Sequence, residues 1–230
     1  MQGKQIKHEL DSLIRAASSV DPCLAKKLDE INRWIKDVKP GSVTAKKFLT
    51  AFLLQLIADA RVWLSIKALA ETADRELAFE QMTPTEKYWY TDLFAKWLNE
   101  NDPKFYIWRQ KLMAEEFNQP DAKIIQSLAE HIIQRGGTVW HCYIADLSMA
   151  TDLIVSYRQK VPLCLQVTSL GEEFSQEKYD SWKNTLEMWE IDRGLFLSYN
   201  PGLQYFVTQL VNLALYNSDN LKAGSYIKFP

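Results

Sequence analysis

Asp152, Gln166 and Thr168 have the residue types and the spacing of a site that could hold a metal ion. Asp152 comes directly before an apolar run, residues 153–155, and Gln166 and Thr168 alternate with apolar residues in the next such run. Because side chains two apart in a strand share a face, Gln166 and Thr168 point the same way, and a hairpin brings Asp152 to the Gln166 end of its neighbour. A half-buried carboxylate needs a partner, and a divalent cation is one of the few that satisfies it. The pattern predicts that these three side chains lie together.

Each of these residues also has a purely structural interpretation. Asp152 can cap a backbone amide where its strand starts, and Gln166 and Thr168 can form the solvent face of an edge strand. His141 alternates with apolar residues and has no zinc-spaced partner, which is more typical of a core or rim residue than of a metal ligand. The elements around these residues must therefore decide between the two interpretations.

The second half of the sequence predicts a small mixed domain of the α+β or α/β class. Apolar residues at helical spacing between 124 and 133 end at Gly136-Gly137, a typical helix stop. Three strand-like runs follow, with Arg158-Gln159-Lys160 as a tight turn between the second and third. A helix over 175–189, a strand over 194–200 and a helix over 203–217 complete the order α-β-β-β-α-β-α. The strand-like runs are TVWHCYIADL, ATDLIVSY and VPLCLQVTSL.

This order, with an aspartate in the second strand and a polar-x-polar motif in the third, resembles the PD-(D/E)XK phosphodiesterase superfamily, the restriction-endonuclease-like proteins. In that resemblance Thr151-Asp152 stands where the family has Pro-Asp, and Gln166-Val167-Thr168 stands where it has Glu-x-Lys. Glu130 stands on the helix where some members supply a further acidic ligand. The resemblance implies a nuclease site that binds Mg²⁺ or Mn²⁺ through Asp152, Gln166 and Glu130.

The motif departs from the family at two of its three positions. Gln166 offers a neutral amide in place of a carboxylate, and Thr168 supplies no cation. Some family members carry the lysine on the following helix, where Lys178 and Lys183 are both available. The altered motif favours a pseudoenzyme that binds nucleic acid or a protein partner without cleaving. A metal-dependent nuclease with a relocated lysine, or an assembly subunit without nucleic-acid contact, are the alternatives.

Residues 1–117 carry helical spacing almost throughout, and they predict an all-helical region before a nuclease-like domain over 121–230. One long helix is expected after Lys39-Pro40-Gly41, and a capping box is expected at Thr83 and Glu86. Four tryptophans lie on apolar helical stripes, which favours packing over base stacking. They are Trp63, Trp89, Trp97 and Trp108.

Composition limits the classes of partner. A hydrophobic content of 47% supports a folded core, and a net charge of −2 with a pI near 6.0 provides no global basic field for nucleic acid. Three dispersed cysteines fit reduced thiols. We also expect no segment of membrane-spanning length, a cytoplasmic location, and a protein partner or a second copy of the chain as the other possible partners.

Overall fold

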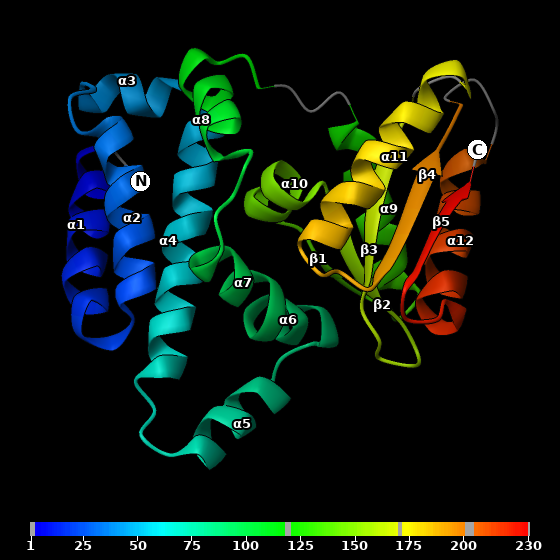
Figure 1. The fold of residues 1–230 in the computed structure, drawn as a ribbon, viewed down its shortest axis with the longest axis horizontal. Coiled ribbons are helices and arrows are strands. Elements are labelled where there is room, and N and C mark those ends of the chain that lie inside the picture. The colour runs from blue at the N-terminus through cyan, green and yellow to red at the C-terminus, as the bar shows by residue number, and fades with distance from the viewer. Residues whose placement is uncertain (1–2, 118–120, 170–171, 201–204, 230) are drawn as a thin grey trace. The chain divides into compact units, whose positions relative to one another are not determined.

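The chain divides into two units, of which the first joins Met1–Gln81 to Phe94–Asn118 and the second joins Met82–Leu93 to Gln119–Pro230 (Figure 1). The computed structural model describes residues 3–117, 121–169, 172–200 and 205–229, and for 172–175 only the backbone. Met82–Leu93 lies within the stretch predicted as the helical region, yet its helix packs on two strands of the second unit, β1 (Thr138–Trp140) and β2 (Leu153–Ser156).

The first unit is built from helices, as the spacing of its apolar residues predicts. Within residues 3–117 the structure contains no strand. Trp63, Trp97 and Trp108 of this unit are buried, as is Trp89, which belongs to the second unit. Trp34 packs against Phe52 with ring centroids 6.2 Å apart. The helices are α1 (Gly3–Val20), α2 (Pro22–Ile35), α3 (Pro40–Ala45), α4 (Lys47–Lys67), α5 (Thr72–Glu80), α7 (Phe94–Asn99) and α8 (Phe105–Ala114).

Two expectations from the sequence about the region of helix α4 are wrong. The single long helix predicted after Pro40 is three helices, because the chain is extended at Lys46 and breaks again between Lys67 and Thr72. In the described part of the chain, α4 is also the one helix long and apolar enough to cross a membrane, so the expectation that no segment reaches that length is wrong. Half of its most apolar stretch is buried, which is equally typical of a core helix.

The second unit surrounds a five-stranded mixed sheet. Its remaining helices are α6 (Pro84–Tyr88), a π-helical turn η1 (Trp89–Leu93), α9 (Ala122–Gln134), α10 (Tyr143–Met149), α11 (Glu172–Met188) and α12 (Phe206–Asn220). The predicted capping box before α6 is present, since the Thr83 hydroxyl accepts from Glu86 N and the Glu86 carboxylate accepts from Thr83 N. The strands are β1 (Thr138–Trp140), β2 (Leu153–Ser156), β3 (Leu163–Thr168), β4 (Arg193–Ser198) and β5 (Ser225–Phe229).

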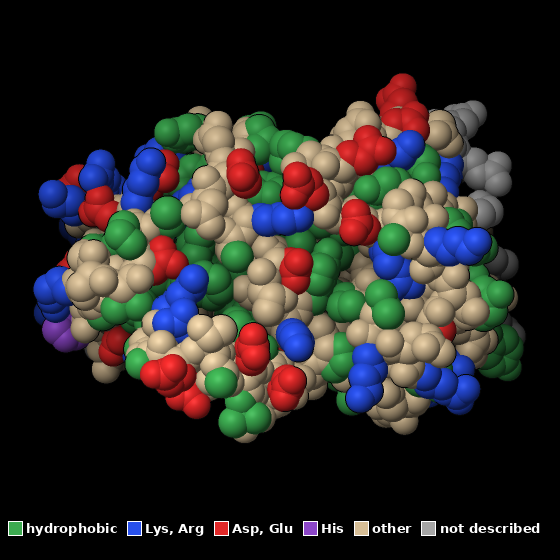
Figure 2. Space-filling view, turned by 60° about the horizontal axis from the view of Figure 1, so that its bottom comes forward, with side chains coloured by type: hydrophobic (Ala, Val, Ile, Leu, Met, Phe, Trp, Pro, Cys, Tyr) green, Lys and Arg blue, Asp and Glu red, His purple; other side chains and the backbone are tan. Residues whose placement is uncertain are grey.

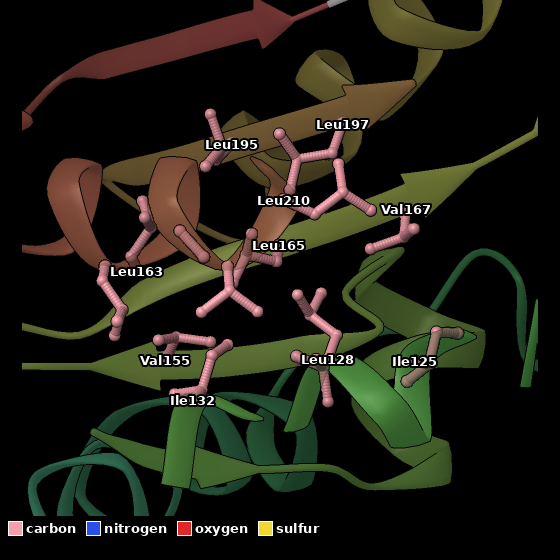
Figure 3. Close-up of a cluster of buried hydrophobic side chains, with 14 residues drawn as sticks. Ile125, Leu128, Ile132, Val155, Leu163, Leu165, Val167, Leu195, Leu197 and Leu210 are labelled. Carbon is pink, nitrogen blue, oxygen red and sulfur yellow. The ribbon is translucent and has the colours of Figure 1, made fainter. Parts of the chain in front are cut away.

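The strands lie in the order β1-β2-β3-β4-β5. The first three pair antiparallel, and β4 and β5 are added parallel to β3. Helices α9 and α12 cover one face of the sheet and α11 covers the other (Figure 1). The apolar core of the first face joins side chains from β2, β3 and β4 to Ile125 and Leu128 of α9 and Leu210 of α12 (Figure 3). Gly194 gives α11 its close approach, because a Cβ there would lie 2.4 Å from Leu186 Cδ1.

The predicted order of elements in this unit is wrong in one place and incomplete in another. The first strand-like run is a strand only at Thr138–Trp140, and its second half is helix α10, whose amino end is capped by Cys142 Sγ. Burial of one side of α10, including Ile144 and Met149, overrides the strand preference of the run. Strand β5 was not predicted, and it extends the sheet beyond β4.

Candidate functional site

Asp152 and Gln166 are in direct contact, as the predicted strand pairing requires. Gln166 Nε2 donates to Asp152 Oδ2 at 2.6 Å, and Val167 N donates to the same oxygen at 2.7 Å. Asp152 N donates to Leu165 O at 2.8 Å, so the β2–β3 hydrogen bonding continues to the residue that directly precedes β2. The nitrogen of the Gln166 amide therefore faces Asp152, and Oδ2 accepts both hydrogen bonds. Asp152 thus receives two hydrogen bonds from the chain itself.

Burial raises the pKa of Asp152 well above its ordinary value. Asp146 of α10 adds to this effect and Asp121 adds a smaller one, whereas the Val167 amide and the Lys178 ammonium oppose it. Asp152 is only 5% exposed, so these neighbours act through protein more than through water. Asp152 is therefore a buried carboxyl group whose surroundings favour its neutral form.

Lys178 is the lysine of α11 that reaches the site. Its Nζ donates to Thr168 Oγ1 at 2.8 Å, and Thr168 is only 1% exposed. Lys183, the other candidate, is half-buried and pairs within its own helix, where its Nζ lies 3.6 Å from Glu187 Oε1. Five residues, or about 1.4 helical turns, separate the two lysines, so they point in different directions from α11. Of the two, only Lys178 is near Asp152, Gln166 and Thr168.

The acidic group that the helix before β1 provides is Asp121 rather than Glu130. Glu130 is exposed, and its carboxylate accepts from Gln126 Nε2 at 3.0 Å. Asp121 lies directly before α9, and Tyr199 Oη donates to its Oδ1 at 2.6 Å. Tyr199 follows β4, where its backbone N donates to Thr168 O at 3.0 Å.

Three residues of the site were missed from the sequence. Asp121 directly precedes a predicted helix, which is the usual position of a capping residue. The sequence therefore gave no reason to place Asp121 near the sheet. Asp146 lies in the run that was predicted as a strand and is helical. Tyr199 comes at the end of a strand that was predicted, β4, and the parallel strand β3 ends beside it. Polar residues at the carboxyl ends of neighbouring parallel strands often belong to a site, and this signal could have found Tyr199.

The donors present do not fit a magnesium site. Mg²⁺ requires several oxygen ligands in near-octahedral geometry, and carboxylates are its preferred protein ligands. Gln166 presents its amide nitrogen to Asp152, and Asp152 Oδ2 is occupied by two hydrogen bonds. Within residues 3–117, 121–169, 172–200 and 205–229, no three His, Cys, Asp or Glu side chains are grouped closely enough to hold a metal ion.

Comparisons with protein-family models, with characterised proteins and with solved structures find no match to this chain. The function of the chain must therefore be inferred from the geometry of its site. Figure 2 shows basic and acidic side chains interspersed on one face of the molecule.

We expect Asp152→Asn to raise the unfolding temperature by a few degrees at pH 8 and to change it little near pH 4. Burial and nearby carboxylates raise the pKa of Asp152, so the folded chain binds this proton more tightly than the unfolded chain. The corresponding stability is lost as the pH rises through the folded pKa, and a neutral amide avoids that loss while its oxygen still accepts from Val167. Thermal unfolding from pH 4 to pH 8 measures the effect. A lower unfolding temperature of the variant in 10 mM Mg²⁺ alone would identify Asp152 as a metal ligand instead.

Proposed function

We propose that the second unit is a restriction-endonuclease-like domain with an altered active site, and that it acts as a binding module which does not cleave nucleic acid. The strand order supports this assignment. The β1–β2–β3 meander is followed by a parallel β4, with Asp152 before β2 and Gln166 and Thr168 on β3, which is the order that the family resemblance implies.

The contact between Gln166 and Asp152 is the single observation that carries the proposal. A metal-dependent nuclease needs Asp152 and the residue at position 166 to offer oxygen atoms to one cation. Here Gln166 instead presents its amide nitrogen, which donates to Asp152 Oδ2 at 2.6 Å. A carboxyl group with a raised pKa, whose Oδ2 already accepts two hydrogen bonds, does not need a metal ion for stability.

A second function, a nuclease with a relocated lysine, is favoured by one contact. Lys178 Nζ lies 2.8 Å from Thr168 Oγ1. Helix α11 therefore supplies a cation next to Thr168, the residue that stands where the family motif has its lysine. A cation stabilises developing charge during phosphoryl transfer but does not replace the metal ligands. The non-cleaving binding module is therefore the preferred proposal.

The proposal predicts no cleavage of single- or double-stranded DNA or RNA by the wild-type chain with Mg²⁺ or Mn²⁺. It also predicts that neither ion changes the unfolding temperature. Metal-dependent cleavage that is lost in both Asp152→Ala and Lys178→Ala, with folding preserved, would establish the relocated-lysine nuclease. Lys183→Ala is the matched control, because Lys183 lies on the same helix and its Nζ is close to Glu187 Oε1, not to Thr168.

A second variant tests the ancestry of the site. Gln166→Glu with Thr168→Lys recreates the family motif and replaces a donor by a second carboxylate beside Asp152. We expect this double variant to lose about 1–3 kcal/mol of unfolding free energy in EDTA, through the lost hydrogen bond and the new repulsion. Mn²⁺ is expected to restore the loss and to support cleavage. If Mn²⁺ changes neither the unfolding free energy nor the cleavage activity of the double variant, the result favours an assembly subunit whose sheet never held a metal.

A further inference from the structure

A cavity of about 480 Å³ lies in the first unit between α2 and the end of α7. This volume is within the range typical of small-ligand pockets. One face of α2 forms a wall, because its lining residues Lys26, Asp29, Glu30 and Arg33 recur at positions i, i+3, i+4 and i+7. The described lining is polar: three cationic side chains, three carboxylates and two carboxamides stand beside a single apolar side chain, Leu98.

Lys27 lines this cavity and its amine is held against two aromatic rings. Its Nζ lies 5.1 Å from the centroid of the Trp97 ring and 5.4 Å from that of the Phe105 ring, and it donates to Glu100 O at 3.3 Å. Both rings are buried, so they keep water away from one side of the amine. The Lys27 side chain is therefore half-buried and has a defined position at the wall of the cavity.

Burial lowers the pKa of Lys27 below its ordinary value. Asp102 and Glu30 raise this pKa and Lys26 lowers it, so burial outweighs the two carboxylates. A larger share of this amine is therefore uncharged near neutral pH than of an ordinary surface lysine. The uncharged amine is the form that attacks a carbonyl carbon.

The contacts of the Lys27 ammonium group also suit an iminium ion. When a lysine amine reacts with an aldehyde, a carbon–nitrogen double bond forms and the carbonyl oxygen leaves as water. Ammonium ion and aldehyde thus give iminium ion and water, with no net gain or loss of protons. The iminium ion keeps one N–H to donate to Glu100 O and keeps its positive charge over Trp97 and Phe105.

The polar lining indicates the kind of aldehyde. Its three cations are balanced by three carboxylates, and Arg33 pairs with Asp29, so the lining as a whole selects neither an anion nor a cation. Carboxylates accept hydrogen bonds from hydroxyl groups, and the carboxamides of Asn99 and Asn101 can donate and accept them. We infer that Lys27 captures a small hydroxylated aldehyde, such as the open-chain form of a short sugar, as a protonated imine in this cavity. This activity belongs to the first unit and does not depend on the proposed function of the second.

The test uses glyceraldehyde as the probe and sodium cyanoborohydride as the reductant, which adds hydride to the iminium carbon and leaves a stable secondary amine. Peptide mass spectrometry then locates the modified lysines. We expect capture at Lys27 to saturate at millimolar glyceraldehyde and to be at least about tenfold faster than at Lys26 or Lys104. Lys26 lines the same cavity but is exposed. Lys104 is not part of the lining, although burial lowers its pKa too. These two lysines separate the effect of the cavity from that of the pKa.

Ligand and cavity are then varied separately. Propionaldehyde has the same carbon chain without the hydroxyl groups, and we expect its capture to need an at least about fivefold higher concentration. Asn101→Ala removes a hydrogen-bonding group from the lining and is expected to weaken capture of glyceraldehyde by about threefold. Asn32→Ala is the matched control, because Asn32 lies on α2 outside the lining and donates to Asp11 Oδ1 at 2.8 Å. Lys27→Arg keeps the charge over the rings and should abolish saturable capture.

Three results would overturn the inference. Equal capture at Lys104 and Lys27 means that a lowered pKa is sufficient and the cavity plays no part. Capture at Lys27 that rises in proportion to glyceraldehyde without saturation means that no ligand is bound before the reaction. Equal capture of propionaldehyde and glyceraldehyde means that the lining does not recognise hydroxyl groups. The comparison of the three lysines uses the wild-type chain, so it decides the question even if Lys27→Arg does not fold.

Discussion

Replacing Arg193 by alanine is expected to lower the unfolding free energy by about 3–4 kcal/mol, because its guanidinium group joins three parts of the second unit. Arg193 begins β4 and is only 7% exposed. Its nitrogens donate at distances of 2.7 to 3.0 Å to backbone carbonyls from the β2–β3 loop and from the end of α12. These acceptors are Val161 O, Pro162 O, Asn217 O, Ser218 O and Leu221 O.

The effect is large because helix ends leave carbonyl groups without intrahelical partners. Arg193 satisfies such groups at the end of α12, where a positive charge is also favourable to the helix dipole. Arg193→Lys keeps the charge and loses the planar fork, so we expect it to recover less than half of the stability. Urea unfolding measures all variants, with exposed Arg158→Ala as the control, expected within about 0.5 kcal/mol of wild type. A loss below about 1 kcal/mol for Arg193→Ala would show that water replaces the guanidinium group.

Local signals in the sequence predicted most of the helices and the central strands, but not the breaks around α4 or helix α10. The apolar spacing of residues 1–117, the capping box at Thr83 and the glycine stop after α9 each depend on neighbours within one helical turn. The contact between Asp152 and Gln166 followed from alternation along β3 and an antiparallel neighbour, which are also short-range properties. These parts of the fold are encoded locally and can be inferred from one sequence.

The remaining parts depend on contacts distant in sequence. Helix α10 has a strand-like composition and is helical because its apolar side is buried in the second unit. The choice between Lys178 and Lys183 depends on how α11 is rotated over the sheet, and this rotation is set by the aromatic side chains beneath it. Asp121 joins the site through Tyr199, a residue 78 positions away. No periodic pattern carries such information.

Phe196→Ala is expected to cost about 3–5 kcal/mol of unfolding free energy, because it empties the space under α11. Phe196 lies on β4 opposite Gln166 of β3 and is fully buried. Its ring contacts two aromatic rings of α11, with centroid distances of 5.8 Å to Tyr179 and 5.5 Å to Trp182. Tyr179 directly follows Lys178, so the same contacts hold the lysine that donates to Thr168.

Amide hydrogen exchange in α11 tests whether Phe196 positions this helix, because a general loss of stability would not affect α11 more than the other helices. Leu195→Ala is the matched control, because Leu195 is the neighbouring residue of β4 and belongs to the core under α9 and α12 on the opposite face. We expect Phe196→Ala to speed amide hydrogen exchange in α11 and Leu195→Ala to speed it in α9 and α12. Phe196→Leu should cost only about 1 kcal/mol and leave α11 protected, since most of the volume is kept. Equal exchange in α11 for the two alanine variants would mean that Phe196 stabilises the unit as a whole and does not position Lys178.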